Sequence, residues 1–461
     1  MTAGAGKRKG RGEQTVRRVS PARGAAFEVL RRVEDESAFA SVLLAHMTAE
    51  LSPQDRALCY ELTLGALRWQ LWLDTAISHF AGRDAASLDA PVRRALRLGL
   101  YQLRFLTRVP ASAAVNESVN LAHAQGLRAA AGLVNAVLRR ATREPNFDPS
   151  SLARDELERI AVAASHPAWL VARWAAEFGA AEAELIARAN NRTPPVAFRV
   201  NALRAAGRGV TGRLREAGVG VEESKIARGA WRVVAGAGGG DALRALASDG
   251  IVYTQDEASQ LVGLAVGARR GERVLDVCAA PGSKATQIAT QTEGLALVVA
   301  CDIYEHRLRT VVESARRQSV DNVLAVALDA EGSPLPFADG SFDRVLVDAP
   351  CTGTGTLRHN PEIRWRITPA DVSDLSARQR GILANAARTV RRGGRLVYST
   401  CSLEREENES VVESFLAARP EFRQARADAP EGLLTAAGAA RTFPHRDETD
   451  GFFVAVLERA V

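Results

Sequence analysis

Two cysteines lie in short motifs of small and polar residues, a setting in which a thiol can react. Cys351 follows Asp348-Ala349-Pro350 and precedes a run of Gly and Thr, and Cys401 lies within Ser399-Thr400-Cys401-Ser402. A thiolate is a strong nucleophile, and covalent catalysis divides one difficult step into two easier ones. A single cysteine is more often a buried structural residue. Two of them at the ends of adjacent predicted strands favour a catalytic interpretation.

Aspartates stand at the ends of four successive predicted strands in the same region. They are Asp276, Asp302, Asp329 and Asp348. Ligands of parallel α/β sheets bind at the carboxyl ends of the strands, and an acid after the second strand is placed to accept hydrogen bonds from ribose hydroxyls. One such acid alone is more often a loop cap. Four at matching positions predict a site for a nucleoside-type cofactor.

The turn after the first of these strands suits the same site. It reads Cys278-Ala279-Ala280-Pro281-Gly282-Ser283-Lys284. Small residues with Pro and Gly at a strand-to-helix turn let a ligand approach the backbone closely. The turn is neither GxGxxG nor a P-loop, which argues against nicotinamide and ATP sites. We predict that these seven residues bind the cofactor together with Asp302, Arg307, Asp329 and Asp348.

Alternating strands and helices from about residue 246 must position these groups. The predicted strands span residues 273–277, 296–301, 323–328, 344–348 and 394–399, with a last pair near 424–428 and 452–457. The predicted helices span residues 283–292, 304–318, 370–391 and 405–418. Such alternation is typical of a mainly parallel sheet with helices on both faces. In this fold Cys301, and Cys59 further upstream, are expected to pack in hydrophobic cores.

The chain before residue 246 has a different pattern. Residues 22–145 predict helices, since apolar residues recur every three or four positions and Ser52-Pro53 is typical of a helix start. Residues 150–245 mix helices with a strand near 196–201, and Gly236–Gly240 predicts a loop. We therefore expect four parts: a basic tail at 1–21, a helical domain at 22–148, a small α/β module at 149–245 and a larger α/β domain at 246–461.

Composition limits the class of protein. The formal net charge of +6 equals the charge of the first 23 residues, which hold seven basic residues against Glu13. This tail is suited to hold a polyanion, although a solvated tail explains it equally well. No apolar run is long enough to cross a membrane, and no secretory signal is evident. Five cysteines without paired spacing argue against disulfides and metal sites, so we expect a cytoplasmic protein with reduced thiols.

The motifs together resemble those of the Sun/Fmu (RsmB) branch of the RNA cytosine-C5 methyltransferases. Asp-Ala-Pro-Cys and Ser-Thr-Cys-Ser are the most specific, and residues 255–260 and 358–365 also resemble that branch. Ser283 and Ala285 depart from the usual Gly and Thr of the family. The helical domain resembles the NusB antitermination fold at residues 22–33, 109–119 and 132–139, and in that family the fold binds RNA.

This resemblance implies a fold class and a mechanism. The fold would be a NusB-like helical bundle, a small α/β module and a Rossmann-like domain that uses S-adenosyl-L-methionine. Cys401 would add to carbon 6 of a cytosine, and Cys351 would assist product release or proton removal. Asp348 would hold the base and Lys284 would orient it. The target base must be unpaired or flipped out for the thiol to reach it.

Several alternatives remain open at this stage. The branch points to 16S ribosomal RNA, whereas other members of the superfamily act on tRNA or 23S RNA. A DNA cytosine-C5 methyltransferase would use Cys351 as the nucleophile, and a binding-only factor would have lost a thiol or a strand-end acid. N-methylation needs an Asn/Asp-Pro-Pro-aromatic motif, which Asp348-Ala349-Pro350-Cys351 does not supply. We expect a monomer that needs no metal and no membrane.

Overall fold

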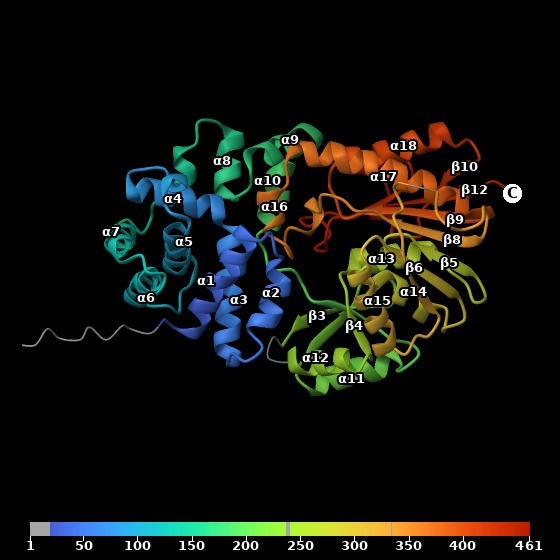
Figure 1. Ribbon diagram of the computed structural model, residues 1–461, viewed down its shortest axis with the longest axis horizontal. Coiled ribbons are helices and arrows are strands. Elements are labelled where there is room, and N and C mark those ends of the chain that lie inside the picture. Colours follow the sequence, from blue (N-terminus) through green and yellow to red (C-terminus); the bar gives the residue numbers. More distant parts are fainter. Residues whose placement is uncertain (1–18, 237–239, 333) are drawn as a thin grey trace, which may run out of the picture. The chain divides into compact units, whose positions relative to one another are not determined.

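The computed structural model describes residues 19–236, 240–332 and 334–461 (Figure 1). The chain forms two compact units, Met1–Ala172 and Arg173–Val461. The boundaries expected near residues 148 and 245 lie inside these units and stay predictions. All the motifs that carry chemistry belong to the second unit, so that unit holds the candidate site.

The described residues of the first unit fold into helices, as the apolar spacing predicted. These are α1 (Pro21–Asp35), α2 (Ala40–Met47), α3 (Pro53–Arg68), α4 (Gln70–Ala81), α5 (Ala90–Phe105), α6 (Ala111–Ala124), α7 (Arg128–Arg143) and α8 (Glu156–Ala163), with the 3₁₀ turns η1 (Ala85–Ser87) and η2 (Pro149–Leu152). Ser52 caps α3 as expected, because its hydroxyl accepts a hydrogen bond from the Asp55 backbone N–H.

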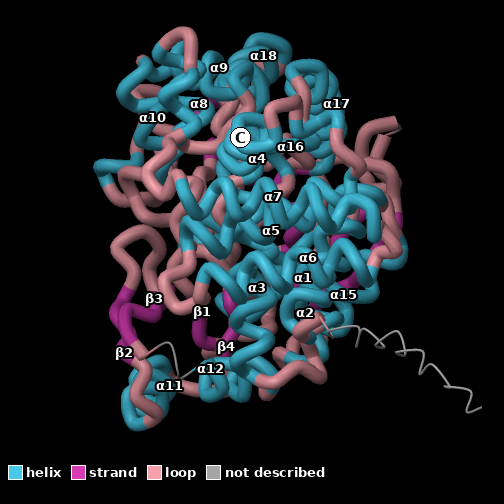
Figure 2. The backbone as a smooth tube through the Cα atoms, turned by 90° about the vertical axis from the view of Figure 1, so that its left-hand side faces the viewer, coloured by secondary structure: helices cyan, strands magenta, loops and turns pink. Residues whose placement is uncertain are grey.

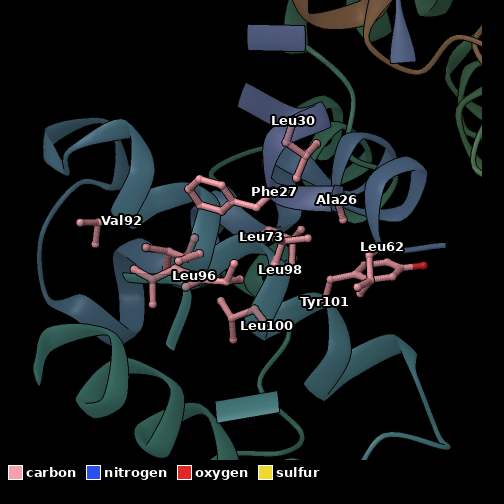
Figure 3. Close-up of a cluster of buried hydrophobic side chains, with 14 of the residues drawn as sticks. Ala26, Phe27, Leu30, Leu62, Leu73, Val92, Leu96, Leu98, Leu100 and Tyr101 are labelled. Atoms are coloured by element: carbon pink, nitrogen blue, oxygen red, sulfur yellow. The ribbon is translucent and has the colours of Figure 1, made fainter. Parts of the chain in front are cut away.

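The core of the first unit forms where the apolar faces of α1, α3, α4 and α5 meet (Figure 3). Phe27 and Leu30 come from α1, and Leu96 and Tyr101 come from α5; each is buried. A spacing of three residues places Phe27 and Leu30 on one face of α1, whereas α5 is buried on all sides, since every residue from Arg94 to Gln102 is buried. Cys59 on α3 is fully buried in this core, which confirms its predicted packing role.

The second unit opens with a small antiparallel sheet. Helix α9 (Ala168–Phe178) crosses the boundary between the units. The elements that follow it are α10 (Ala180–Ala189), β1 (Ala197–Val200), α11 (Gly207–Glu216), β2 (Gly220–Glu223), β3 (Ala230–Ala235), α12 (Gly240–Ser248) and β4 (Val252–Thr254). The strand order is β2-β3-β1-β4, and α11 and α12 lie beside the sheet (Figure 2). The sequence predicted only β1. Of the predicted glycine loop, residues 237–239 lie outside the described residues, and Gly240 begins α12.

An eight-stranded sheet forms the rest of the second unit. Its strands are β5 (Arg273–Asp276), β6 (Leu297–Asp302), β7 (Val323–Ala327), β8 (Phe342–Asp348), β9 (Val390–Thr400), β10 (Phe422–Ala425), β11 (Ala440–Arg441) and β12 (Phe453–Arg459). The order is β10-β12-β9-β8-β5-β6-β7, with β11 beside β12. Strands β5 to β9 pair in parallel, and β10, β11 and β12 pair antiparallel. The predicted mainly parallel sheet is confirmed.

Helices cover both faces of this sheet (Figure 1). One face packs on α13 (Glu257–Val266), α14 (Ser283–Gln291) and α15 (Glu305–Arg317), and the other packs on α17 (Pro369–Thr389) and α18 (Glu409–Ala418). Successive residues of a strand point to opposite faces. Accordingly Val274 lies in the core between the sheet and α13, α14 and α15, the first core of this unit. Its neighbour Leu275 lies in the second core, between the sheet and α17 and α18. The predicted core position of Cys301 is also confirmed, since it is fully buried in the second core.

Within the described residues, none of the helices has the length and apolar character needed to cross a membrane.

Candidate active site

Parallel pairing of β5, β6, β8 and β9 brings the motif residues to one edge of the sheet. Asp276, Asp302 and Asp348 are the last residues of β5, β6 and β8. Asp348 stands opposite Ser399 in the β8–β9 register, and the Ala349 backbone N–H donates to the Ser399 carbonyl at 2.8 Å. The loops after β8 and β9 therefore leave the sheet side by side.

The two candidate thiols meet at this edge. The Sγ atoms of Cys351 and Cys401 are 3.4 Å apart, and both side chains are half-buried. Contact with the Cys401 sulfur, burial and the nearby negative charges of Cys401 and Glu407 raise the pKa of Cys351 well above its usual value. Cys351 therefore stays a thiol near neutral pH and is placed to donate its S–H to the Cys401 sulfur.

An ion pair lies next to the thiols. Lys284 Nζ donates to Asp348 Oδ2 at 2.6 Å, and the Ser399 hydroxyl donates to Asp348 Oδ1 at 2.7 Å. Burial lowers the pKa of Lys284, but the charge and hydrogen bond of Asp348 and the nearby Cys401 sulfur outweigh it, so that the net shift is upward. Lys284 is therefore a buried ammonium group whose charge acts on Cys401.

Glycine is required where the Cys401 loop touches its neighbours. The Gly355 N–H donates to the Cys401 carbonyl, and the Gly451 N–H donates to the Gly355 carbonyl, both at 2.9 Å. A Cβ on Gly355 would lie 2.0 Å from the Gly451 oxygen and 2.9 Å from the Cys401 oxygen. Backbone atoms cannot yield as a flexible side chain can, so only glycine allows this approach.

The turn between β5 and α14 packs closely against its neighbours. Gly282 has a φ of +100°, and a Cβ there would lie 3.0 Å from Val311 Cα. The Ala279 N–H donates to the Cys301 carbonyl at 2.6 Å, and the Gly282 N–H donates to the Ala279 carbonyl at 2.7 Å. Ala280 and Ser283 are half-buried and Pro281 is exposed. Burial raises the pKa of the half-buried Cys278 thiol well above its usual value, which makes a reactive role there unfavourable.

Arg307 joins this turn to the acid of the next strand. Its Nη1 lies 3.2 Å from Asp302 Oδ2, and its Nη2 donates to the Ala280 carbonyl at 3.3 Å. The buried Asp302 carboxylate also accepts from the Tyr304 N–H at 3.0 Å. The structure therefore brings together the predicted turn, Asp302 and Arg307.

The other two strand-end acids differ in burial. Asp276 is fully buried and, among the described residues, neither of its carboxylate oxygens has a hydrogen-bond partner. Burial, with the negative charge of Asp348, raises the pKa of Asp276 to about 7. Such oxygens are open to hydroxyl or amine donors of a ligand. Asp329, in contrast, is exposed after the edge strand β7 and accepts from the Glu331 N–H at 2.9 Å.

Two groups near the thiols were not singled out from the sequence. Glu407 lies in a charged run that is typical of a solvated surface, yet it is fully buried. Asp450 pairs with Arg358 at 3.4 Å, and burial raises its pKa well above the usual value. Ligand atoms of Asp256, His359 and Asp450 lie within 4.8 Å of one another, but Asp256 Oδ1 already accepts from Ala258 N–H and the Thr449 hydroxyl.

Fold and site together define a class. The strand order with antiparallel β12 beside β9 is that of the Rossmann-like methyltransferases, and the acidic strand ends, the Gly282 turn and the thiol pair lie at the ligand-binding edge of that fold. Residues 264–458 match the family model described as 16S rRNA methyltransferase RsmB/F. Residues 20–143 match the NusB family, and residues 166–236 match the ferredoxin-like domain of RsmF/B-like methyltransferases.

Individual relatives agree with these matches. A probable ribosomal RNA small subunit methyltransferase B of Bacillus subtilis is 34% identical over 446 residues, covering 95% of this chain and 98% of that protein. The ribosomal RNA small subunit methyltransferase B of Pseudomonas putida is 35% identical, covering 94% and 97%. The crystal structure of PH0851 superposes with a TM-score of 0.82 at 27% identity, covering 96% and 99%. The chain belongs to the RsmB/F family of 16S rRNA methyltransferases.

Proposed function

We propose that this protein methylates carbon 5 of a cytosine in small-subunit ribosomal RNA through a covalent bond from Cys401 to carbon 6. The observation that carries the proposal is the thiol pair beside the Lys284–Asp348 ion pair, with sulfurs 3.4 Å apart. Carbon 5 of cytosine is too weak a nucleophile to attack a sulfonium methyl unaided. Addition of a thiolate to carbon 6 makes it one, which is the purpose of covalent catalysis here.

The residues present suit S-adenosyl-L-methionine as the cofactor. The carboxylates of Asp276 and Asp302, both buried, supply acceptors for hydroxyl and amine donors, and two oxygens of Asp276 are still open. When bound, S-adenosyl-L-methionine supplies the methyl group as a sulfonium. The turn at residues 278–284, with Asp302 and Arg307, would hold it. Asp348, which pairs with Lys284, would contact both the cofactor and the cytosine. Asp329, which is exposed, would lie at the margin of the cofactor-binding residues.

Each side chain then has a role in the reaction. The buried Lys284 ammonium lies near the Cys401 sulfur, which forms a bond to carbon 6 and increases the electron density at carbon 5. Asp348 accepts a hydrogen bond from the exocyclic amine and holds the base. After methylation, the proton on carbon 5 passes to a solvent base, the electron pair of the broken C–H bond restores the ring double bond, and the Cys401 sulfur departs as a thiolate. Cys351 assists this last stage, since it is a thiol in contact with Cys401.

The partners follow from the same proposal. Residues 22–148, which overlap the match to the NusB family at residues 20–143, would bind the RNA. We further propose that the enzyme acts in the cytoplasm as a monomer. Transfer RNA and 23S RNA are the alternative substrates.

Methyl transfer from labelled S-adenosyl-L-methionine tests the proposal. Small-subunit RNA, 23S RNA and tRNA that lack methylation are incubated separately with the enzyme, digested to nucleosides and separated. We expect label in 5-methylcytidine from small-subunit RNA. Label in another nucleoside would contradict the reaction, label only in 23S RNA or tRNA would contradict the substrate, and no label would favour a binding factor.

A further inference from the structure

A single buried carboxylate, that of Glu407, joins the two loops that carry the thiols. Glu407 ends the 3₁₀ turn η5 (Arg405–Glu407). Its Oε1 accepts from the Thr352 backbone N–H at 2.9 Å, and its Oε2 accepts from the hydroxyls of Thr352 and Ser402, both at 2.5 Å. Thr352 directly follows Cys351, and Ser402 directly follows Cys401. One side chain therefore fixes the neighbour of each thiol.

The surroundings of Glu407 hold it in place. Gln379 on α17 donates through Nε2 to Glu407 Oε1 and to the carbonyl of Pro350, each at 2.9 Å. The Tyr398 hydroxyl donates to the backbone carbonyl of Glu407. Gln379, Tyr398 and Glu407 are all fully buried. The loop of Cys351 is thus tied to Glu407 from both sides of the cysteine.

The partners of the Glu407 carboxylate among the described residues are neutral donors. They are the backbone N–H and hydroxyl of Thr352, the Ser402 hydroxyl and the Gln379 amide. Burial raises the pKa of the carboxyl group although these donors oppose the shift. Desolvation of a buried carboxylate without a cation is unfavourable, and the hydrogen bonds offset it. Because the donors lie on the two thiol loops or on the helix that holds one of them, the carboxylate acts on the position of the thiols.

The charge of Glu407 also reaches the thiols. It is one of the causes that raise the pKa of Cys351, after contact with Cys401 and burial. Removing the charge should therefore move the ionisation of Cys351 to lower pH, an effect that a purely structural role would not produce.

We propose that Glu407 is a positioning residue: its carboxylate holds the Cys351 and Cys401 loops at the separation at which one sulfur serves the other. The catalytic consequence rests on the proposed function, whereas the geometry of the thiol pair does not. Because misplacement of a reacting group by about 1 Å can cost on the order of 100-fold in rate, loosening these loops should mainly lower kcat.

Three variants separate this role from general stability. Glu407→Gln keeps the size of the side chain, but its amide nitrogen cannot accept a hydrogen bond. The donors to one of the two carboxylate oxygens of Glu407 therefore lose their acceptor. Thr352→Val removes one hydroxyl and keeps the backbone N–H that donates to Glu407. Glu406→Gln is the matched control, because Glu406 is exposed and its carboxylate accepts a hydrogen bond from Arg173, away from the thiols.

Exchange with glutathione measures the thiol separation without RNA. One cysteine attacks oxidised glutathione, forms a mixed disulfide with one glutathione and releases the other in reduced form. The second cysteine then attacks the mixed disulfide, releases reduced glutathione and forms the Cys351–Cys401 disulfide. Peptide mass spectrometry gives the ratio of Cys351–Cys401 disulfide to mixed disulfide. We expect wild type and Glu406→Gln to give mainly the internal disulfide, and Glu407→Gln and Thr352→Val to shift the ratio several-fold toward the mixed one.

Two further readouts complete the test. For Glu407→Gln we expect kcat for methyl transfer to fall while KM for RNA and cofactor stays unchanged, and the pH profile of Cys351 alkylation to move to lower pH. If Glu407→Gln gave the wild-type ratio of internal to mixed disulfide together with wild-type kcat, the inference would be overturned. If Glu407→Gln does not fold, the same two measurements on Thr352→Val test the inference. If wild type labels no cytosine but the ratio still shifts, the proposed function fails and the positioning role stands.

Discussion

The Sγ atoms of Cys351 and Cys401 lie 3.4 Å apart although 50 positions separate them in the chain. Adjacent parallel strands produce this contact, because the loops after β8 and β9 leave the same edge of the sheet. At this distance the Cys351 S–H can donate to the Cys401 sulfur, and this contact is the first cause of the raised pKa of Cys351. In the proposed mechanism Cys401 is the nucleophile and Cys351 is the partner that stays protonated.

Substitution of each thiol should have a different result. Cys401→Ala removes the proposed nucleophile, and we expect neither methyl transfer nor a covalent complex with RNA. Cys351→Ala leaves the nucleophile but removes the thiol that assists its release, so a covalent protein–RNA complex should accumulate. Denaturing gel electrophoresis with labelled RNA detects the complex. A complex formed by Cys401→Ala but not by Cys351→Ala would reverse the two roles.

The pH dependence of Cys351 alkylation follows from the causes of its pKa shift. A raised pKa means less thiolate at a given pH, so Cys351 should react with iodoacetamide only as the pH rises above the usual cysteine range, about 8.5. Contact with Cys401 is the first of the causes, so in Cys401→Ala the pKa falls and the midpoint of the profile moves to lower pH. Greater access would change the maximum rate but not the midpoint.

Peptide mapping distinguishes the thiols in this experiment. Cys59 is the internal reference, because burial in the helical unit raises its pKa to about 11 and Cys401→Ala does not touch it. An unchanged midpoint for Cys351 in Cys401→Ala would contradict the interpretation of the thiol contact.

Replacement of Lys284 should affect chemistry more than binding. Lys284→Met removes the buried charge next to Cys401 and, among the described residues, leaves the Ser399 hydroxyl as the one side-chain donor to Asp348. Loss of one preorganised electrostatic contact typically lowers kcat by about 100-fold or more. Steady-state methylation kinetics measure the change, with the exposed Lys225→Met as the control. An unchanged kcat would show that the Lys284 charge does not assist the thiol.

Much of the candidate site could be predicted because its signals are local. The turn at residues 278–284 and the motifs around Cys351 and Cys401 are short, and the strand ends follow from apolar runs bounded by small residues. Parallel topology then requires Asp302 and Asp348 to lie at one edge. The strands β2, β3 and β4 were missed since they are short and partly exposed, with weak alternation.

Glu407 could not be found in this way. The run Glu404–Glu409 has the composition of a solvated helix start, and its burial depends on Thr352 and Gln379, which are distant in sequence. Asp450 is similar, because its partner Arg358 comes from the loop region after Cys351. Non-local hydrogen bonds decide the burial of both carboxylates, and a single sequence does not display them.

The contact made by Gly355 gives a steric test of the Cys401 loop. A methyl group at this position would overlap the Gly451 oxygen and crowd the Cys401 oxygen, so Gly355→Ala must displace one of the two backbone segments. We expect activity to fall strongly and the free energy of unfolding to drop by about 1 to 3 kcal/mol, as for other overpacked sites. Gly432→Ala is the control, because no atom lies within 4 Å of a Cβ there. Denaturant titration and methylation assays give both quantities. If Gly355→Ala retained wild-type kcat, the placement of the Cys401 backbone would not matter to the reaction. That result would contradict the hypothesis that catalysis depends on a fixed geometry of the thiol pair.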